Sequence, residues 1–159
     1  MSGTKGTGAH YGRWPGFGPV RHDDCGVDCH GQGGRLLAVI LIVEDEMFIR
    51  ENAEWAIEDL GHIIFSAGDV AEAFLHLEMS ENIDALFVDI RLNTAGYGGY
   101  EIADRAVKSK PDLRVLYTSG TEFSAEMRAC FVEGAHFLQK PYTENQLQNS
   151  IEGLLASPS

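Results

Sequence analysis

Residues 37–46 read Leu37-Ala-Val-Ile-Leu-Ile-Val43 and then Glu44-Asp45-Glu46. An unbroken aliphatic run of this length is typical of a strand buried on both faces, as in a parallel sheet between helices. The acidic triplet places carboxylates directly at the carboxyl end of that strand. Glu46 opens an amphipathic helical pattern that extends to Leu60, and Gly61 is a typical helix terminator. The segment therefore predicts one strand–helix unit with acidic side chains between its two elements.

The same alternation occurs four more times along the chain. Further strands are predicted at 62–66, 85–89, 113–118 and 136–139, and further helices at 69–79, 99–108, 122–133 and 143–155. Thr143 and Gln146 predict a capping box at the start of the last helix. Cys130 falls on the inward stripe of helix 122–133, so we expect its thiol in the core.

Repeated strand–helix alternation specifies a parallel sheet with helices on both faces. About 120 residues in this order fit a flavodoxin-like (βα)5 three-layer sandwich of class α/β. The expected five-stranded parallel sheet has the strand order 2-1-3-4-5.

The composition changes sharply near Arg35 in this chain of 159 residues. Residues 1–35 hold 10 of the 18 glycines and show no apolar periodicity, so we interpret them as a flexible Gly-rich extension. The domain is expected to occupy residues 36–159. The formal net charge of −12 would repel nucleic acid and anionic lipid, so neither is an expected partner.

Cellular setting is inferred from the apolar runs and the cysteines. The longest apolar run, Leu36 to Val43, is far shorter than the roughly 20 residues that a transmembrane helix needs. Three cysteines and the absence of a secretory pattern favour a reduced, cytoplasmic setting. Zinc binding by the extension is a weaker hypothesis, since the Cys-x3-Cys-His spacing matches no common finger. Its candidate ligands are His22, Cys25, Cys29 and His30.

Chemically active residues gather where the predicted strands end. Glu44 and Asp45 follow the first strand, Asp89 ends the third, Thr118 ends the fourth, and Lys140 follows the fifth. Ligands of open α/β sheets bind beyond the carboxyl ends of the strands, so these five side chains should converge. Taken singly, each could be an ordinary cap or a solvated loop residue, but the topology brings them together.

This set of side chains suits phosphoryl transfer. Clustered carboxylates repel one another, and a hard cation such as Mg2+ would relieve the repulsion. A carboxylate can attack phosphorus to give an acyl phosphate. A lysine ammonium and a threonine hydroxyl can hold the transferred oxygens by charge and hydrogen bonding.

The motifs around these residues resemble those of the two-component response-regulator receiver domain, the CheY-like family. The resemblance covers Leu36 to Leu155, with the motifs in order and at family spacing. The matching segments are Val43-Glu44-Asp45-Glu46, Leu86-Phe87-Val88-Asp89, Gly99-Tyr100-Glu101-Ile102-Ala103, Val115-Leu116-Tyr117-Thr118-Ser119-Gly120 and Phe137-Leu138-Gln139-Lys140-Pro141.

The resemblance implies a role for each site residue. Asp89 would accept a phosphoryl group from a sensor histidine kinase or a histidine phosphotransfer protein. Asp45, Asp89 and the backbone carbonyl of Arg91 would bind Mg2+ directly, and Glu44 would act through water. Lys140 would pair with Asp89 at rest and with the phosphoryl group afterwards.

The resemblance also implies a switch. Thr118 would move towards the phosphoryl group, and Phe137, at the aromatic switch position, would turn inward with it. The change would appear on the face made by the fourth helix, the fifth strand and the fifth helix. A downstream protein, or a second copy of the chain, would read that face.

Two features of the chain qualify this resemblance. The loop after Asp89 has Asn93 in place of the usual proline and is about two residues longer, with Ala95-Gly96-Tyr97-Gly98 inside. Only Ala156 to Ser159 follow the last helix, so we expect a single-domain regulator.

Three other interpretations remain open at this level. A degenerate receiver would bind partners without phosphorylation, although Asp45, Asp89, Thr118 and Lys140 are all present. A phosphatase of the haloacid dehalogenase type would have a second aspartate where Arg91 stands. A flavin-binding protein would need hydroxyls and glycines, rather than the acidic triplet, in the first strand–helix loop.

Overall fold

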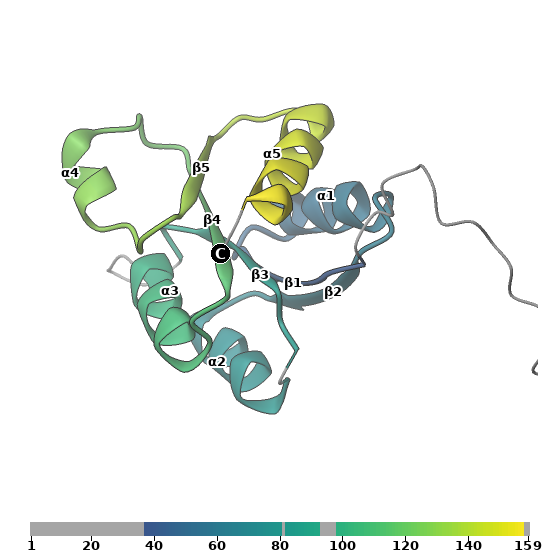
Figure 1. Ribbon diagram of the computed structural model, residues 1–159. Coiled ribbons are helices and arrows are strands. Elements are labelled where there is room, and N and C mark those ends of the chain that lie inside the picture. Colours follow the sequence, from purple (N-terminus) through teal and green to yellow (C-terminus); the bar gives the residue numbers. More distant parts are fainter. Residues whose placement is uncertain (1–36, 81, 93–97, 158–159) are drawn as a thin grey trace, which may run out of the picture. The chain divides into compact units, whose positions relative to one another are not determined.

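The computed structural model describes residues 37–80, 82–92 and 98–157 of the chain (Figure 1). In this part of the chain, strands and helices alternate from end to end. The strands are β1 (Val39–Val43), β2 (Ile63–Ala67), β3 (Ala85–Asp89), β4 (Arg114–Ser119) and β5 (His136–Gln139). The helices are α1 (Met47–Glu58), α2 (Val70–Met79), α3 (Gly98–Ser109), α4 (Ala125–Ala129) and α5 (Glu144–Ala156).

The strands form one parallel sheet in the order β2-β1-β3-β4-β5. The predicted flavodoxin-like topology is therefore confirmed. In the register of the sheet, Asp89 of β3 lies beside Thr118 of β4, and Ser119 of β4 lies beside Gln139 of β5. The carboxyl ends of the central strands consequently meet at one edge of the sheet.

Helices cover both faces of the sheet, and a hydrophobic core lies between the sheet and the helices on each face (Figure 1). Helices α1 and α5 cover one face, where Ala53 and Ile57 pack with Leu147 and Ile151. Helices α2 and α3 cover the other face, where Leu77 and Ile102 belong to the second core. Because β1 and β3 are covered on both faces, their sequences are apolar runs rather than alternating ones.

The start of α5 and the end of α1 follow the predicted signals. The hydroxyl of Thr143 accepts a hydrogen bond from the backbone N–H of Gln146, and the Gln146 side chain accepts one from the backbone of Thr143. The predicted capping box is confirmed. Gly61, just after α1, has a φ of 86°, a left-handed conformation that favours glycine.

The fourth helix is much shorter than predicted. The sequence pattern indicated residues 122–133, whereas α4 spans Ala125–Ala129 and contains no buried residue. Ser124 caps its start by accepting a hydrogen bond from the N–H of Met127. The chain then leaves the helix so that Phe131 can stack on Tyr117 of β4, with ring centroids 4.4 Å apart. Tertiary aromatic packing therefore overrides the local helical pattern.

The shortening of α4 also corrects the prediction for Cys130. Its thiol is exposed rather than in the core, and its Sγ contacts the carbonyl oxygen of Glu126 at 3.5 Å. The sequence pattern placed Cys130 inside the helix, on its buried face. In the structure α4 ends at Ala129, and Cys130 is the residue that caps this end.

Some sequence predictions concern residues outside the described part of the chain. These are the extension at 1–35, with its zinc hypothesis, and the loop residues Asn93, Ala95, Gly96 and Tyr97. Among the described helices, none is long and apolar enough to cross a membrane.

Candidate functional site

The structure brings the predicted acidic and basic residues together at the carboxyl edge of the sheet. Lys140, immediately after β5, donates hydrogen bonds to Glu44 Oε2 at 2.6 Å and to Asp89 Oδ2 at 2.7 Å. Glu44 is fully buried and Asp89 is 6% exposed. A single ammonium thus bridges two carboxylates that come from β1 and β3.

Burial and the ion pairs together set the protonation of this group. Burial raises the pKa of Glu44 to about 7, against the lowering effect of Lys140. Burial lowers the pKa of Lys140, but hydrogen bonds to Asp89 and Glu44 outweigh it, so that pKa lies above its ordinary value. The ammonium therefore stays charged at neutral pH, while Glu44 lies near the midpoint of its titration.

Asp45 completes a cluster of three carboxylates. One carboxylate oxygen from each of Glu44, Asp45 and Asp89 lies within 4.8 Å of the others. Oxygen ligands at this spacing suit a hard divalent cation. The loop that carries Glu44 and Asp45 is held by Arg50, whose Nη1 donates to the carbonyl oxygen of Glu44 at 2.7 Å.

The segment after β3 is also held at the site. The backbone N–H of Arg91 donates to Asp89 Oδ1 at 3.0 Å, which puts the Arg91 backbone beside the carboxylate. Gly99, at the start of α3, packs directly on the end of β3. A Cβ at Gly99 would lie 2.8 Å from Ile90 Cα, so only glycine permits this approach.

Thr118 lies next to Asp89 across the β3–β4 register. The residue is fully buried, and its Oγ1 has no hydrogen-bond partner among the described residues. An unpaired buried hydroxyl costs stability, so Thr118 Oγ1 is an unsatisfied polar group in the strand next to Asp89.

A chain of aromatic rings links this strand end to the outer surface. Phe137 of β5 is half-buried, and its ring lies 5.2 Å from Phe123 and 5.9 Å from Phe131. Phe131 stacks on Tyr117, the neighbour of Thr118 in β4. Phe137 is thus positioned between β4 and the segment that contains α4.

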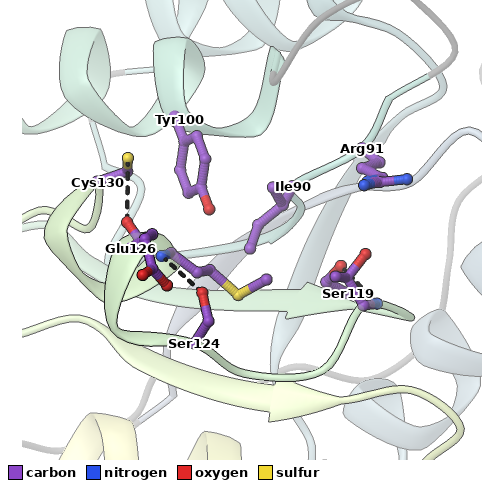
Figure 2. Close-up of a pocket in the computed structure, with 9 residues that line it drawn as sticks. Ile90, Arg91, Tyr100, Ser119, Ser124, Glu126 and Cys130 are labelled. Atoms are coloured by element: carbon purple, nitrogen blue, oxygen red, sulfur yellow. Dashed lines mark hydrogen bonds between the residues drawn. The ribbon is translucent and has the colours of Figure 1, made fainter.

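A cavity of about 300 Å3 lies between this segment and the residues of α3 and the end of β3 (Figure 2). Ile90 and Tyr100 form one side of it, and Ser124, Glu126 and Cys130 approach from the α4 segment. Arg91 and Ser119 line its end nearest the acidic site. The α4 segment is therefore not tightly packed on β3 and α3.

Three residues that shape the site received no individual role from the sequence. Arg50 binds the loop of Glu44, and Gly99, quoted only as part of a matching motif, is small enough to let α3 approach Asp89. Gln139, also quoted only within a motif, donates from its side chain to the carbonyl oxygens of Ser119 and Lys140. A polar residue at the end of a short apolar strand, directly before the lysine, was the available signal for Gln139.

Comparison with known proteins agrees with this geometry. The crystal structure of a response regulator receiver protein from Sinorhizobium medicae superimposes with a TM-score of 0.68 at 26% identity, covering 76% of this chain and 95% of that one. A CheY-like receiver domain protein from Methanospirillum hungatei gives a TM-score of 0.67 at 26% identity, with 75% and 94% covered.

A longer protein, NtrX from Brucella abortus, also matches over part of its length. Its TM-score is 0.65 at 27% identity, covering 76% of this chain and 27% of NtrX. No curated protein sequence matches the chain. Residues 40–152 match the family model of the response regulator receiver domain, and the chain therefore belongs to that family, the receiver domains of two-component response regulators.

Proposed function

We propose that this receiver domain is a phosphoacceptor and that Asp89 takes the phosphoryl group. The observation that carries the proposal is the pairing of Asp89 Oδ2 with Lys140 Nζ at 2.7 Å inside a three-carboxylate cluster. The Asp89 carboxylate can act as a nucleophile, the Lys140 ammonium lies beside it, and the Asp89 side chain still reaches solvent.

The reaction is an in-line displacement at phosphorus. A carboxylate oxygen of Asp89 forms the new O–P bond as the bond to the donor breaks, and the electron pair leaves with the donor. For a phosphohistidine donor the leaving imidazole takes up a proton, and for acetyl phosphate the leaving group is acetate. Lys140 Nζ lies 2.7 Å from Asp89 Oδ2 before transfer. After transfer, the same ammonium can pair with an oxygen of the phosphoryl group that Asp89 carries.

The carboxylate cluster fits Mg2+. Glu44, Asp45 and Asp89 supply hard oxygen donors within 4.8 Å of one another, and the Arg91 backbone lies beside them. In this proposal Asp45, Asp89 and the Arg91 carbonyl hold the ion directly, and Glu44 acts through water. When bound, the ion neutralises the negative charge that gathers between carboxylate and phosphoryl oxygens.

Thr118 and Phe137 form the proposed switch. The unpartnered hydroxyl of Thr118 gains an acceptor when phosphoryl oxygens arrive at its neighbour Asp89. Movement of Thr118 shifts the end of β4, and the cavity beside α4 gives that segment room to follow. Phe137 then turns inward, which changes the surface formed by α4, β5 and α5.

The proposed partners follow from this cycle. A sensor histidine kinase or a histidine phosphotransfer protein supplies the phosphoryl group. A downstream protein, or a second copy of this chain, reads the α4–β5–α5 surface. Nucleic acid is not a proposed ligand, because the chain carries a net charge of −12.

The mass of the intact protein tests the proposal. After incubation with acetyl phosphate and Mg2+, the wild type should gain one phosphoryl group and Asp89→Asn should gain none. Asp84→Asn is the matched control, because Asp84 lies at the opposite end of β3, where it accepts a hydrogen bond from Val39. Equal mass gain in all three proteins would refute Asp89 as the acceptor. No gain in any of them would favour a degenerate receiver.

A further inference from the structure

The Gln139 side chain makes two hydrogen bonds that the proposed reaction does not use. Its Nε2 donates to the carbonyl oxygen of Ser119 at 3.0 Å and to the carbonyl oxygen of Lys140 at 3.0 Å. A side-chain amide carries two N–H donors, and two carbonyl acceptors require that the nitrogen end faces them. Both donors of Gln139 are therefore engaged with the backbone.

These contacts join the two strand ends that carry the switch. The N–H of Lys140 also donates to the carbonyl of Ser119, at 2.9 Å. The backbone of Lys140 is thus tied at both its N–H and its carbonyl, either directly or through Gln139. Ser119, the residue after Thr118, receives both the Lys140 N–H and the Gln139 amide.

The position of β5 explains why such a tie matters. β5 is an edge strand of four residues, paired with β4 alone, and all its residues are half-buried. Pro141, the second residue after the strand, has no backbone N–H with which to extend the ladder beyond Lys140. The Gln139 side-chain amide therefore adds a hydrogen bond to the Ser119 carbonyl of β4 at the residue where β5 ends, directly before Lys140.

We propose that Gln139 is a positioning residue that sets the placement of Lys140 relative to Asp89 and couples it to the Thr118 strand end. The inference rests on the proposed function, since phosphoryl transfer is where the position of Lys140 matters. Lys140 Nζ must lie within hydrogen-bond distance of Asp89 before transfer and of the phosphoryl oxygens afterwards. A misplacement of about 1 Å at a reacting site costs on the order of 100-fold in rate.

The substitution Gln139→Leu removes both donors while keeping a similar volume. We expect its rate of mass gain with acetyl phosphate and Mg2+ to fall by roughly 10- to 100-fold. Gln148→Leu is the matched control, because the half-buried Gln148 also donates to a backbone carbonyl, that of Ala56, at 3.0 Å. That bond joins α5 to α1, so its loss should leave the rate unchanged. Equal rates in the two variants would overturn the proposal.

A double-mutant cycle separates positioning from a general structural effect. If Gln139 acts through Lys140, then Gln139→Leu should not slow the reaction further in a Lys140→Ala background. A full additional loss in that background would show that Gln139 acts by another route and would overturn the proposal.

A measurement without phosphorylation keeps this inference separate from the proposed function. In metal-free protein labelled with 15N at lysine Nζ, the Lys140 ammonium held by two carboxylates should give a slowly exchanging signal. The signal should persist in Gln148→Leu and broaden or disappear in Gln139→Leu. An unchanged signal in Gln139→Leu would overturn the positioning role, even if the wild type accepts phosphate. Failure of the wild type to gain phosphate would refute the proposed function alone.

Discussion

Gly99→Ala should destabilise the domain, because α3 begins in direct contact with the end of β3. An added Cβ would lie 2.8 Å from Ile90 Cα and 2.9 Å from the carbonyl carbon of Asp89. Both are backbone atoms at or directly after the end of β3, so neither can rotate away as a side chain could. Overpacking of this kind costs about 1–3 kcal/mol. Alanine is about 0.5–1 kcal/mol better than glycine in a helix, which offsets part of that cost. We expect a net loss of about 1 kcal/mol, and at most about 2.5 kcal/mol, in the free energy of unfolding.

Urea denaturation followed by circular dichroism measures this change. Gly153→Ala in α5 is the matched control, since no atom of the described residues outside its own helix and chain neighbours lies within 4 Å of an added Cβ. The control should gain roughly 0.5–1 kcal/mol from helix propensity alone. The two substitutions are therefore expected to have opposite signs. Equal stabilisation by both would refute the close packing of α3 on Asp89 and with it the positioning of the acceptor by this glycine.

Three further predictions concern side chains at the site. Lys140→Met should raise the affinity for Mg2+ by roughly tenfold, because its ammonium no longer competes for Glu44 and Asp89; weaker binding by calorimetry would contradict this. Burial raises the pKa of Glu44 from 4.5 to about 7, so between these pH values the folded state keeps a proton that the unfolded state loses. In EDTA, the free energy of unfolding of the wild type, measured relative to that of Glu44→Gln, should therefore fall as the pH rises from 4.5 to about 7. A pH-independent difference in unfolding free energy would exclude that titration. Arg91→Asn is expected to shorten the lifetime of the phosphorylated protein. The family resemblance implies that the residue at this position, two beyond Asp89, influences how water reaches the phosphorylated aspartate, and Arg91 is bulky there. Unchanged hydrolysis would count against this.

Much of the fold could be predicted because its signals are local and repeated. The apolar runs of β1 and β3 require burial on both faces, and strand–helix alternation leaves few topologies that satisfy this. The convergence of Asp89, Thr118 and Lys140 then follows from the topology, since parallel strands end at one edge. Their proximity in the structure reflects strand order more than any single motif.

The errors arose where tertiary contacts override a local pattern. Residues 122–133 have helical periodicity, yet Phe131 is used for stacking on Tyr117 rather than for the buried face of a helix. The exposure of Cys130 follows from the same packing. The Gln139 bonds to the backbone depend on how β5 meets β4, a relation that no periodicity in the sequence encodes.

The position of the phosphoryl group tests the central claim most directly. Borohydride reduces an aspartyl phosphate to homoserine, and peptide mass mapping then identifies the modified residue. After treatment with acetyl phosphate and Mg2+, we predict homoserine at position 89 and at no other aspartate. Homoserine at Asp45 or at any other position, or its absence from a protein that has gained phosphate, would contradict Asp89 as the acceptor.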